Sequence, residues 1–356
     1  MIDQSHLQEF AGRFKQLHDN ISTVIRGKDR QISMALFALF AEGHLLLEDK
    51  PGTGKTSLAK AITRSIGGSW NRIQFTPDLL PSDITGTLIL RQGELVPKIG
   101  PIHANIVLAD EINRASPKTQ SALLQAMEEK QITIDDQIYD LPRPFVVIAT
   151  QNPVEQEGTY RLPEAQLDRF MLRTELGYPD LEAEVDVLRS HAAGVTSEQL
   201  SPVYGLETVQ WMIQVSAAVP VAPEVQRYIV RLSRATRVLT EEGHREYDLG
   251  DGRHGARERE DIDRIRKALR ERNFELPVLR LGVSTRGSVS MMRAAQAVAA
   301  SQASEGVTPE HVNFIARSIM AHRMALTSQA ELDGLDRGEL ADLIANSTSV
   351  DLMRGR

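Results

Sequence analysis

The sequence predicts an α/β fold, a three-layer sandwich around a parallel β-sheet, followed by a smaller all-helical domain. Residues 105–109 and 145–149 are continuous apolar runs with β-branched residues. Such runs are typical of strands that are covered on both faces of a parallel sheet. Helical patterns alternate with them, which favours helices on either side of that sheet. After about Pro179 no further apolar strand is visible, so we expect an α/β domain over 1–180 and a helical domain over 181–356.

Apolar spacing places the elements of the first domain in order. Residues 6–20 and 29–42 have the periodicity of helices, and the second of these is expected to be largely buried. A short apolar strand at 44–48 then runs into a loop rich in Gly and Pro, and helical spacing resumes over 56–66. This strand–loop–helix order is the local context in which we search for a ligand site.

The second domain is predicted to consist of helices separated by polar segments. Residues 241–257 are rich in Gly and charge, which predicts an exposed loop, and the charged stretch to Arg272 is expected to be a solvated helix. The segment after Gln329 has only a weak pattern. The expected helices cover residues 180–192, 206–217, 222–239, 258–272, 287–301 and 308–325.

Composition is that of a soluble globular protein, with 41% hydrophobic and 25% charged residues. The net charge of −7 argues against a nucleic-acid binder that uses a broad basic surface. The absence of cysteine excludes disulfides, thiolate catalysis and thiolate metal sites. Residues 1–4 lack the features of a signal peptide, and the longest apolar run, 34–41, is too short to span a membrane. We therefore expect a cytoplasmic protein without a membrane segment.

A phosphate-binding loop is predicted between the strand at 44–48 and the helix at 56–66, in the sequence EDKPGTGKT (48–56). Its glycines let backbone amides close around a phosphate chain, and the following helix adds its positive end. Lys55 can reach the β- and γ-phosphates and the Thr56 hydroxyl can ligate Mg²⁺, so the expected ligands are ATP and Mg²⁺. Asp49 stands where the strict pattern has Gly, and Asp tolerates unusual backbone angles. The loop residues expected at the nucleotide are Pro51, Gly52, Thr53, Gly54, Lys55, Thr56 and Ser57.

Polar residues follow the two apolar strands. Asp110 and Glu111 end the first one, where Asp110 could support Mg²⁺ and Glu111 could polarise a water. Strands often end in a solvated acid, but the pair is a strong signal some fifty residues after a phosphate loop. Asn152, after the second strand, could hold the attacking water, although Asn before Pro is also a common turn residue.

Two arginines and two weaker patterns leave alternatives open. Arg169 could form a surface salt bridge or act as an arginine finger on a neighbour's ATP, and Arg286 could simply begin a helix. Ser57 and Lys60 have serine–lysine hydrolase spacing, but the partner motifs of that class are missing. The nine histidines are scattered, so no dedicated metal site is supported.

Together these motifs resemble the AAA+ superfamily and, within it, the MoxR family. The resemblance covers about residues 15–180 densely and 200–325 more thinly. It is specific because "NRA" after the paired acids and "LPEAQLDRF" are far rarer than a phosphate loop. The matching segments are HLLLEDKPGTGKT (44–56), ADEINRASPKTQSALLQAMEE (109–129), IATQNPVEQEGTYRLPEAQLDRF (148–170), GVSTRG (282–287) and TPEHV…HR (308–323).

The resemblance implies roles for residues at matching positions. Asn152 would sense the γ-phosphate, Arg169 would be the finger that reaches a neighbour's ATP, and Arg286 would be the sensor arginine of the helical lid. The stretch that packs against adenine would include Val24, Ile25 and Gly27.

The resemblance also implies inserts and an assembly. Residues 79–100 and 131–141 look like hairpins that, in this family, point into the central pore of a hexameric ring; the second has alternating apolar residues and an Asp-Asp turn. The stretch near 241–276 is longer than in relatives, and we expect a surface loop there rather than a docking element for a partner.

The implied function is an ATP-hydrolysing chaperone that remodels or matures protein complexes. Its partners would be copies of itself and a protein client, such as a von Willebrand A-domain protein. One alternative is an AAA+ motor acting on DNA, which the acidic pI near 5.8 and the lack of a DNA-binding module disfavour. A second alternative is a nucleotide-gated scaffold with little turnover.

Overall fold

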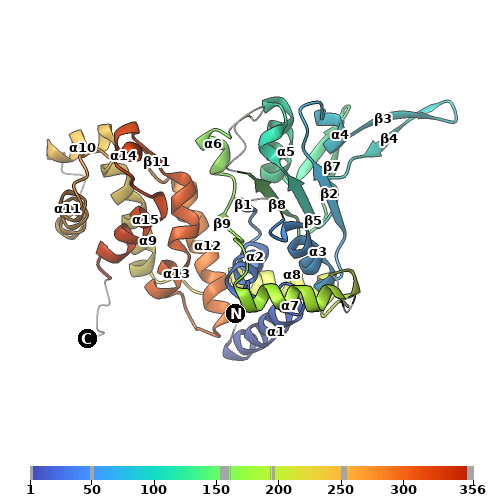
Figure 1. The fold of residues 1–356 in the computed structure, drawn as a ribbon, viewed down its shortest axis with the longest axis horizontal. Helices are drawn as coiled ribbons and strands as arrows, with labels where there is room; N and C mark the ends of the chain where they lie inside the picture. The colour runs from blue at the N-terminus through green and yellow to red at the C-terminus, as the bar shows by residue number, and fades with distance from the viewer. Residues whose placement is uncertain are drawn as a thin grey trace. The chain divides into compact units, whose positions relative to one another are not determined.

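The computed structural model describes residues 3–48, 52–152, 160, 162–192, 194, 197–249 and 255–350. Contacts divide the chain into two compact units, residues 8–215 and residues 1–7 with 216–356, which Figure 1 traces from blue to red. In the part of the chain so described, no helix combines the length and the apolar character needed to cross a bilayer.

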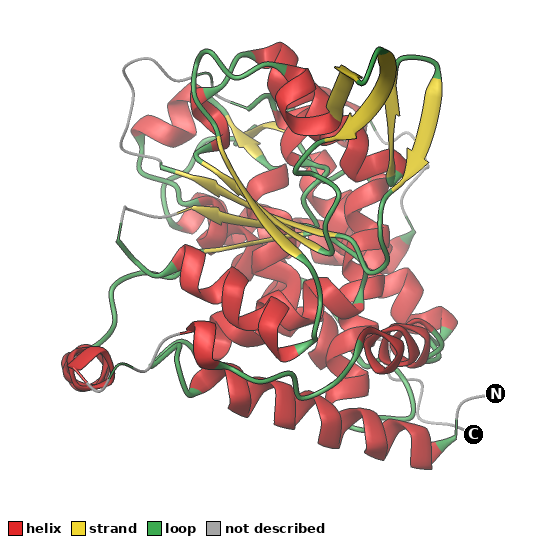
Figure 2. Ribbon diagram, turned by 90° about the vertical axis from the view of Figure 1, so that its right-hand side faces the viewer, coloured by secondary structure: helices red, strands yellow, loops and turns green. Residues whose placement is uncertain are grey.

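A parallel sheet forms the centre of the first unit, and helices cover it (Figure 2). The expected strands at 44–48, 105–109 and 145–149 are confirmed as β1, β5 and β8, whereas β2 and β9 were not anticipated. The sheet and its flanking helices confirm the predicted α/β sandwich. In spatial order, the strands within the described residues are β2 (Trp70–Gln74), β5 (Ile106–Asp110), β8 (Val146–Gln151), β1 (Leu45–Glu48) and β9 (Leu172–Thr174).

Aromatic packing joins the first two helices of this unit, both of which we expected. The ring of Phe10 on α1 meets Phe40 on α2 with 5.2 Å between centroids, and Phe14 meets Phe37 at 5.2 Å. Such rings bury large apolar areas, so this packing holds α1 against α2. The described helices that lie wholly or mostly within residues 8–215 are α1 (Gln4–Ser22), α2 (Asp29–Phe40), α3 (Lys55–Ser65), α4 (Pro81–Thr85), α5 (Pro117–Glu129), α6 (Glu164–Leu167), α7 (Leu181–Ala192) and α8 (Leu206–Ala217).

The helices α7 and α8 group with the sheet, although we placed the domain boundary near residue 180. Polar contacts explain this grouping. The Val203 amide donates to the Ser65 carbonyl over 2.8 Å, and Lys60 Nζ lies 2.9 Å from the Glu198 carboxylate. The segment that precedes α8 is therefore held against the end of α3, so the compact unit continues to residue 215.

Two antiparallel hairpins extend from the described part of the first unit, within the ranges expected for inserts. One pairs β3 (Gly86–Arg91) with β4 (Glu94–Ile99), and the other pairs β6 (Gln131–Ile134) with β7 (Gln137–Asp140). The turn of the first contains Gln92 and Gly93, both with positive φ (53° and 90°), which suits a tight two-residue hairpin turn. Figure 1 shows β3 and β4 projecting away from the sheet.

The second unit is mainly helical. It also contains a short antiparallel pair, β10 (Leu279–Leu281) with β11 (Ala325–Leu326), which corrects the expectation of helices only. Strands of three and two residues are too short to give a periodic pattern. The helices described here are α9 (Pro223–Val238), α10 (Glu241–Asp248), α11 (Ala256–Glu271), α12 (Thr285–Ser301), α13 (Pro309–Met320), α14 (Ser328–Leu332) and α15 (Arg337–Ser347).

The prediction of a loop over 241–257 is wrong for residues 241–248, which form α10. The Thr240 hydroxyl caps this helix by accepting from the Gly243 amide over 3.2 Å. Gly243 lies so close to α9 that a Cβ there would be 2.0 Å from the Arg237 carbonyl oxygen. The glycine that suggested a loop therefore permits close packing of two helices. Residues 250–254 of the expected insert lie outside the described residues.

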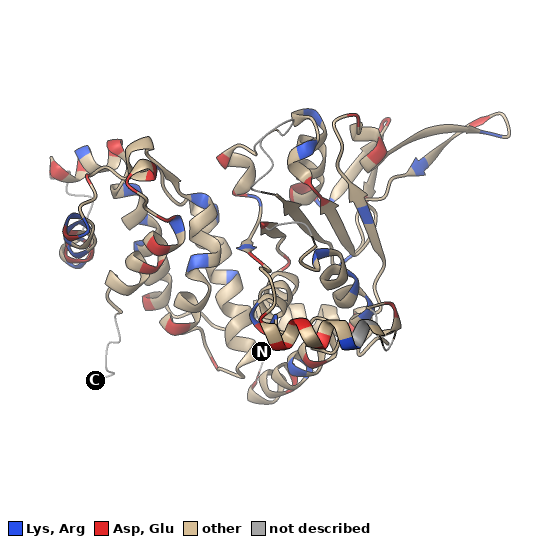
Figure 3. Cartoon of the chain, viewed as in Figure 1, with Lys and Arg blue, Asp and Glu red and all other residues tan. Residues whose placement is uncertain are grey.

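Helix α11 is not merely solvated, although both signs of charge lie along it (Figure 3). Ile262, Ile265 and Leu269 recur at helical spacing and are buried. They bury an apolar stripe inside the second unit, where α11 contacts α9 and α15. The expectation of a surface insert near 241–276 is thus corrected for these residues, which contribute to the core.

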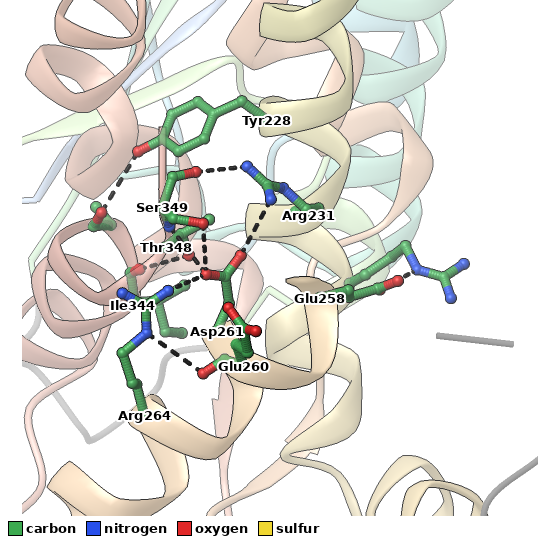
Figure 4. A network of polar contacts seen from close by, with 11 residues as sticks. Tyr228, Arg231, Glu258, Glu260, Asp261, Arg264, Ile344, Thr348 and Ser349 are labelled. Carbon is green, nitrogen blue, oxygen red and sulfur yellow. Dashed lines mark hydrogen bonds and ion pairs between the residues drawn. The ribbon is translucent and has the colours of Figure 1, made fainter. Parts of the chain in front are cut away.

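A buried carboxylate on α11 holds the described residues that follow α15 (Figure 4). Asp261 Oδ1 accepts from the amide and the hydroxyl of Ser349 over 3.0 and 2.9 Å. Arg231 Nη1 lies 3.4 Å from Asp261 Oδ2, and Arg264 also pairs with this carboxylate. A buried charge needs such partners, so the network fixes the segment after α15 against α9 and α11.

His44, which precedes β1, makes the stability of the first unit depend on pH. Its Nδ1 accepts from the Val147 amide (3.0 Å), so the proton lies on Nε2, which donates to the Met127 carbonyl (3.1 Å). Burial lowers the pKa of His44 from 6.5 to about 4. As the pH falls, His44 therefore becomes protonated in the unfolded chain before it does so in the folded protein. The contribution of neutral His44 to the free energy of unfolding is complete above pH 6.5 and is lost as the pH falls toward 4.

We expect urea unfolding to show a loss of about 2 kcal/mol from this group between pH 7 and pH 5. A His44→Gln variant cannot take up that proton, so its stability should change less over the same interval. Equal pH dependence in the two proteins would contradict a neutral buried His44.

Candidate functional site

In the described part of the loop after β1, two glycines adopt backbone angles that let a chain turn closely around a phosphate. Gly52 and Gly54 have φ of 83° and 94°, a region that glycine enters without cost. Gly54 caps α3, whose first turn contains no acidic residue, so the positive end of the helix is not opposed by a carboxylate. Lys55 and Thr56 begin this helix, and Ser57 follows as an exposed residue. Asp49, Lys50 and Pro51, although part of the predicted loop, lie outside the described residues.

The paired acids lie at the same edge of the sheet as this loop, because all the strands are parallel. β8 separates β5, which ends at Asp110, from β1, which leads into the loop. Thr150 on β8 donates its hydroxyl proton to Asp110 Oδ1 over 2.6 Å. Ligands of open parallel sheets bind outside the carboxyl ends of the strands, which is where these side chains gather.

Glu111 adopts an unusual backbone conformation that the neighbouring strand supports. Its φ of 56° lies in the left-handed region, which is costly for a residue with a side chain and is typical of functional sites. The Glu111 amide donates to Thr150 Oγ1 over 2.8 Å. Thr150 therefore holds both acids: it donates to Asp110 and accepts from the backbone of Glu111.

Two residues of β2 also reach the acids. Arg72 donates to Asp110 Oδ2 from Nε (3.1 Å) and Nη2 (2.6 Å), and the same Nη2 donates to Gln74 Oε1 (2.7 Å). Gln74 Nε2 in turn donates to Glu111 Oε2 over 2.7 Å, and Arg114 Nη1 donates to the same oxygen over 2.9 Å. A continuous chain of hydrogen bonds thus runs from one acid to the other.

The oxygen donors of this edge fit Mg²⁺. Asp110 is 8% exposed, and its carboxylate, with the Thr56 hydroxyl, offers the hard oxygen ligands that Mg²⁺ prefers. Among the described residues, no group of three or more His, Asp or Glu side chains is arranged to hold a metal ion.

Asn152 directly follows β8 and is buried. Its carbonyl lies 3.5 Å from Asn113 Nδ2, on the turn that follows Glu111. Gln120 on α5 braces this turn, because its Nε2 lies 3.1 Å from the Ile112 carbonyl and 3.2 Å from the Ala115 carbonyl. The structure thus brings Asn152 to the same edge as the acids, while its role as a γ-phosphate sensor stays a prediction.

The stretch expected to pack against adenine contacts the start of α7. Ile25 is buried and Val24 is half-buried. Gly27 has a φ of 65°, and a Cβ at this position would be 2.7 Å from the Ala183 Cβ, so a larger residue would not fit. Lys28 Nζ donates to the Tyr178 carbonyl over 2.8 Å. The adenine role of these residues stays a prediction.

The two arginines lie in different units. Arg169 follows α6 in the first unit, where Nη1 lies 2.7 Å from Glu128 Oε2 and donates to the Leu124 carbonyl over 2.8 Å. This is the salt bridge that the sequence left open, and the finger role stays a prediction. Arg286 lies exposed in the first turn of α12, in the second unit, after the N-cap Ser284.

Sequence reasoning missed Arg72, Gln74 and Thr150. A signal existed in β2, where Arg72 and Gln74 flank the apolar Ile73, because alternation of this kind is typical of a strand. The strand holds only one fully buried apolar residue, however, and it was too polar to stand out.

The chain is similar to known proteins in sequence and in fold. The family model described as "ATPase family associated with various cellular activities (AAA)" matches residues 44–172, and that of the AAA lid domain matches residues 276–343. The chain is 40% identical to the uncharacterised protein YeaC of Bacillus subtilis over 94% of both chains. It is 36% identical to the chaperone MoxR1 of Mycobacterium tuberculosis over 88% of this chain and 76% of that one. A crystal structure from Cytophaga hutchinsonii, assigned as a candidate ATPase, superimposes with a TM-score of 0.82, at 34% identity and 97% coverage of each chain.

Proposed function

Because the chain belongs to the MoxR family of AAA+ ATPases, we propose that it hydrolyses ATP with Mg²⁺ to remodel protein complexes. The observation that carries this proposal is the position of Asp110 and Glu111. They lie at the carboxyl edge of the sheet, at the end of β5, which β8 separates from β1, the strand that leads into the phosphate loop. Binding groups and a candidate base therefore converge on one edge.

Each side chain has a chemical part in this proposal. The glycine loop and Lys55 hold the triphosphate, and Thr56 with Asp110 holds Mg²⁺, which neutralises charge on the phosphates when bound. Glu111 accepts the proton of the attacking water, because its carboxylate is the candidate base at this edge, and Thr150 holds its backbone amide. Asn152 orients that water toward the γ-phosphate.

Steady-state phosphate release in the presence of Mg²⁺ tests the proposal. We expect turnover with the purified protein, whereas binding of ATP without phosphate release would favour a nucleotide-gated scaffold. Adding duplex DNA separates a further alternative, because a DNA motor would show salt-dependent stimulation of the ATPase.

A protein client is supported by the β3–β4 hairpin and by the relative that is named a chaperone. Leu90 and Leu95 pair near the tip of the hairpin and are 72% and 66% exposed. Most of the hairpin is tan in Figure 3, with charge concentrated at few positions. Exposed apolar side chains are typical of surfaces that contact proteins, whereas binding of DNA phosphates needs cations. We infer that this hairpin contacts the client in the central pore of a ring.

The ring would complete each ATP site with Arg169 of the neighbouring subunit. In the described structure, Arg169 pairs with Glu128 and is partly exposed, so an arriving phosphate could replace the carboxylate. We expect Arg169→Ala to bind ATP normally and to lose roughly 10³-fold or more in turnover. Mixing it with a Lys55→Ala protein should restore part of the turnover. In a mixed ring, a Lys55→Ala subunit would supply its intact Arg169 to the intact nucleotide site of an Arg169→Ala neighbour.

Glu128→Gln provides the matched control. It removes the negative charge that pairs with Arg169 within the subunit and keeps the arginine itself, so turnover should remain near that of the unmodified protein. Full turnover by Arg169→Ala, or no recovery on mixing, would remove the finger role.

A further inference from the structure

Arg72 on β2 forms an ion pair with Asp110, the carboxylate expected to support Mg²⁺. We propose that Arg72 is a positioning residue that competes with Mg²⁺ for the carboxylate of Asp110. It thereby sets how much the metal contributes to nucleotide binding. The inference rests on the proposed function, because it concerns the same nucleotide site.

The contacts of Asp110 show the competition. Thr150 donates to Oδ1 at 2.6 Å, while two nitrogens of Arg72 donate to Oδ2 at 3.1 and 2.6 Å. Both oxygens of the carboxylate are therefore engaged, one by a neutral hydroxyl and one by a cation. A metal ion, or a water bound to it, must share or replace the contact with Arg72 in order to use Oδ2.

The register of the sheet places Arg72 there. Along the parallel pair, Arg72 lies opposite Leu108 and Gln74 lies opposite Asp110. Because side chains alternate between the two faces of a strand, Arg72 and Asp110 point to the same face as diagonal neighbours. A shift of one residue in this pairing would turn Arg72 to the other face, so the contact depends on the pairing of β2 with β5.

Exposure indicates which of the two groups can move. The Arg72 side chain is 48% exposed, whereas that of Asp110 is 12% exposed. An arginine at such a position is solvated at one side, loses little when it leaves an ion pair and can keep its contact with Gln74. Asp110 is mostly buried and is hydrogen-bonded to Thr150 on the neighbouring strand. Arg72 is therefore the group that moves away from Asp110 when a divalent cation binds beside the phosphates. Its positive charge repels that cation and weakens its binding.

The test compares nucleotide affinity with and without the metal. The dissociation constant of a fluorescent, slowly hydrolysed ATP analogue is measured in EDTA and in saturating MgCl₂, and the ratio of the two values reports the contribution of the metal. We expect Arg72→Met to raise this ratio roughly two- to fivefold, the range of a partly exposed ion pair. Arg72→Lys retains the charge and should stay within about twofold of the unmodified protein.

Two further variants make the result specific. Arg64→Met removes another exposed arginine, from the last turn of α3, and should leave the ratio unchanged. In an Asp110→Asn background, Arg72→Met should have no further effect, because the group through which it acts is gone. Thermal unfolding of each variant confirms that it is folded.

An unchanged or lower ratio in Arg72→Met would overturn the inference, provided that the unmodified protein binds the analogue. An equal rise in the Asp110→Asn background would also overturn it, because Arg72 would then act as a distant charge and not through Asp110. Failure of the unmodified protein to bind the analogue would instead overturn the proposed function.

Discussion

Replacing Lys55 with alanine is expected to weaken ATP binding about 100-fold or more, which amounts to its loss at ordinary concentrations. Lys55 is the first residue of α3, directly after the left-handed Gly54 that turns the chain into the helix. The ammonium group acts as a point charge on the β- and γ-phosphates, and alanine offers no replacement for it. Isothermal titration calorimetry with ATP and Mg²⁺ measures the change.

The matched control is Lys60→Ala on the same helix. Lys60 pairs with Glu198 and lies 5.7 Å from the centre of the Trp70 ring, so it belongs to the packing of the unit. ATP affinity should remain near that of the unmodified protein in this variant. Should Lys55→Ala bind ATP as tightly as Lys60→Ala, the phosphate-loop assignment would be lost.

Replacing Glu111 with glutamine is expected to lower ATP turnover by roughly 10²- to 10⁴-fold while ATP still binds. Glutamine has nearly the shape of glutamate, and its carbonyl oxygen can still accept from Gln74 and Arg114. The amide cannot take a proton from water, so the expected loss concerns the chemical step. Phosphate release measures turnover, and calorimetry with ATP measures binding.

Glu129→Gln on α5 is a suitable control, because this exposed glutamate contacts Gln125 on its own helix. Its turnover should be unchanged. If the Glu111→Gln protein hydrolysed ATP at the normal rate, a different residue would have to be the base. The same variant serves to identify the client, since a protein held in the ATP state should retain the client in an affinity pull-down.

The sequence predicted the elements whose signal is local and strong. β1, β5 and β8 are continuous apolar runs, and each is followed by the residues of a site: the phosphate loop, the paired acids and Asn152. Parallel strands bring their carboxyl ends to one edge, so chain order together with strand type was enough to gather these residues. The short or polar strands β2, β9, β10 and β11 were not predicted, because a few residues give no clear periodicity of apolar side chains.

Glycine was a misleading signal at α10. A stretch rich in Gly and charge is typical of a loop, but Gly243 serves to bring α10 against the backbone of α9. No property of the residue itself distinguishes these two uses. The difference is the presence of a neighbouring helix, which the sequence does not show.

The sequence by itself determined the identity of the motifs, the order of β1, β5 and β8 along the chain and the residues that could carry phosphate, metal and proton chemistry. Only the tertiary structure decided how these residues are held: Thr150 between the two acids, Arg72 on Asp110, Gln74 on Glu111 and Arg169 on Glu128. Motifs depend on neighbours along the chain, and these are read directly from the sequence. The contacts depend on which strand pairs with which, and in what register, and that choice is made by packing over the whole unit.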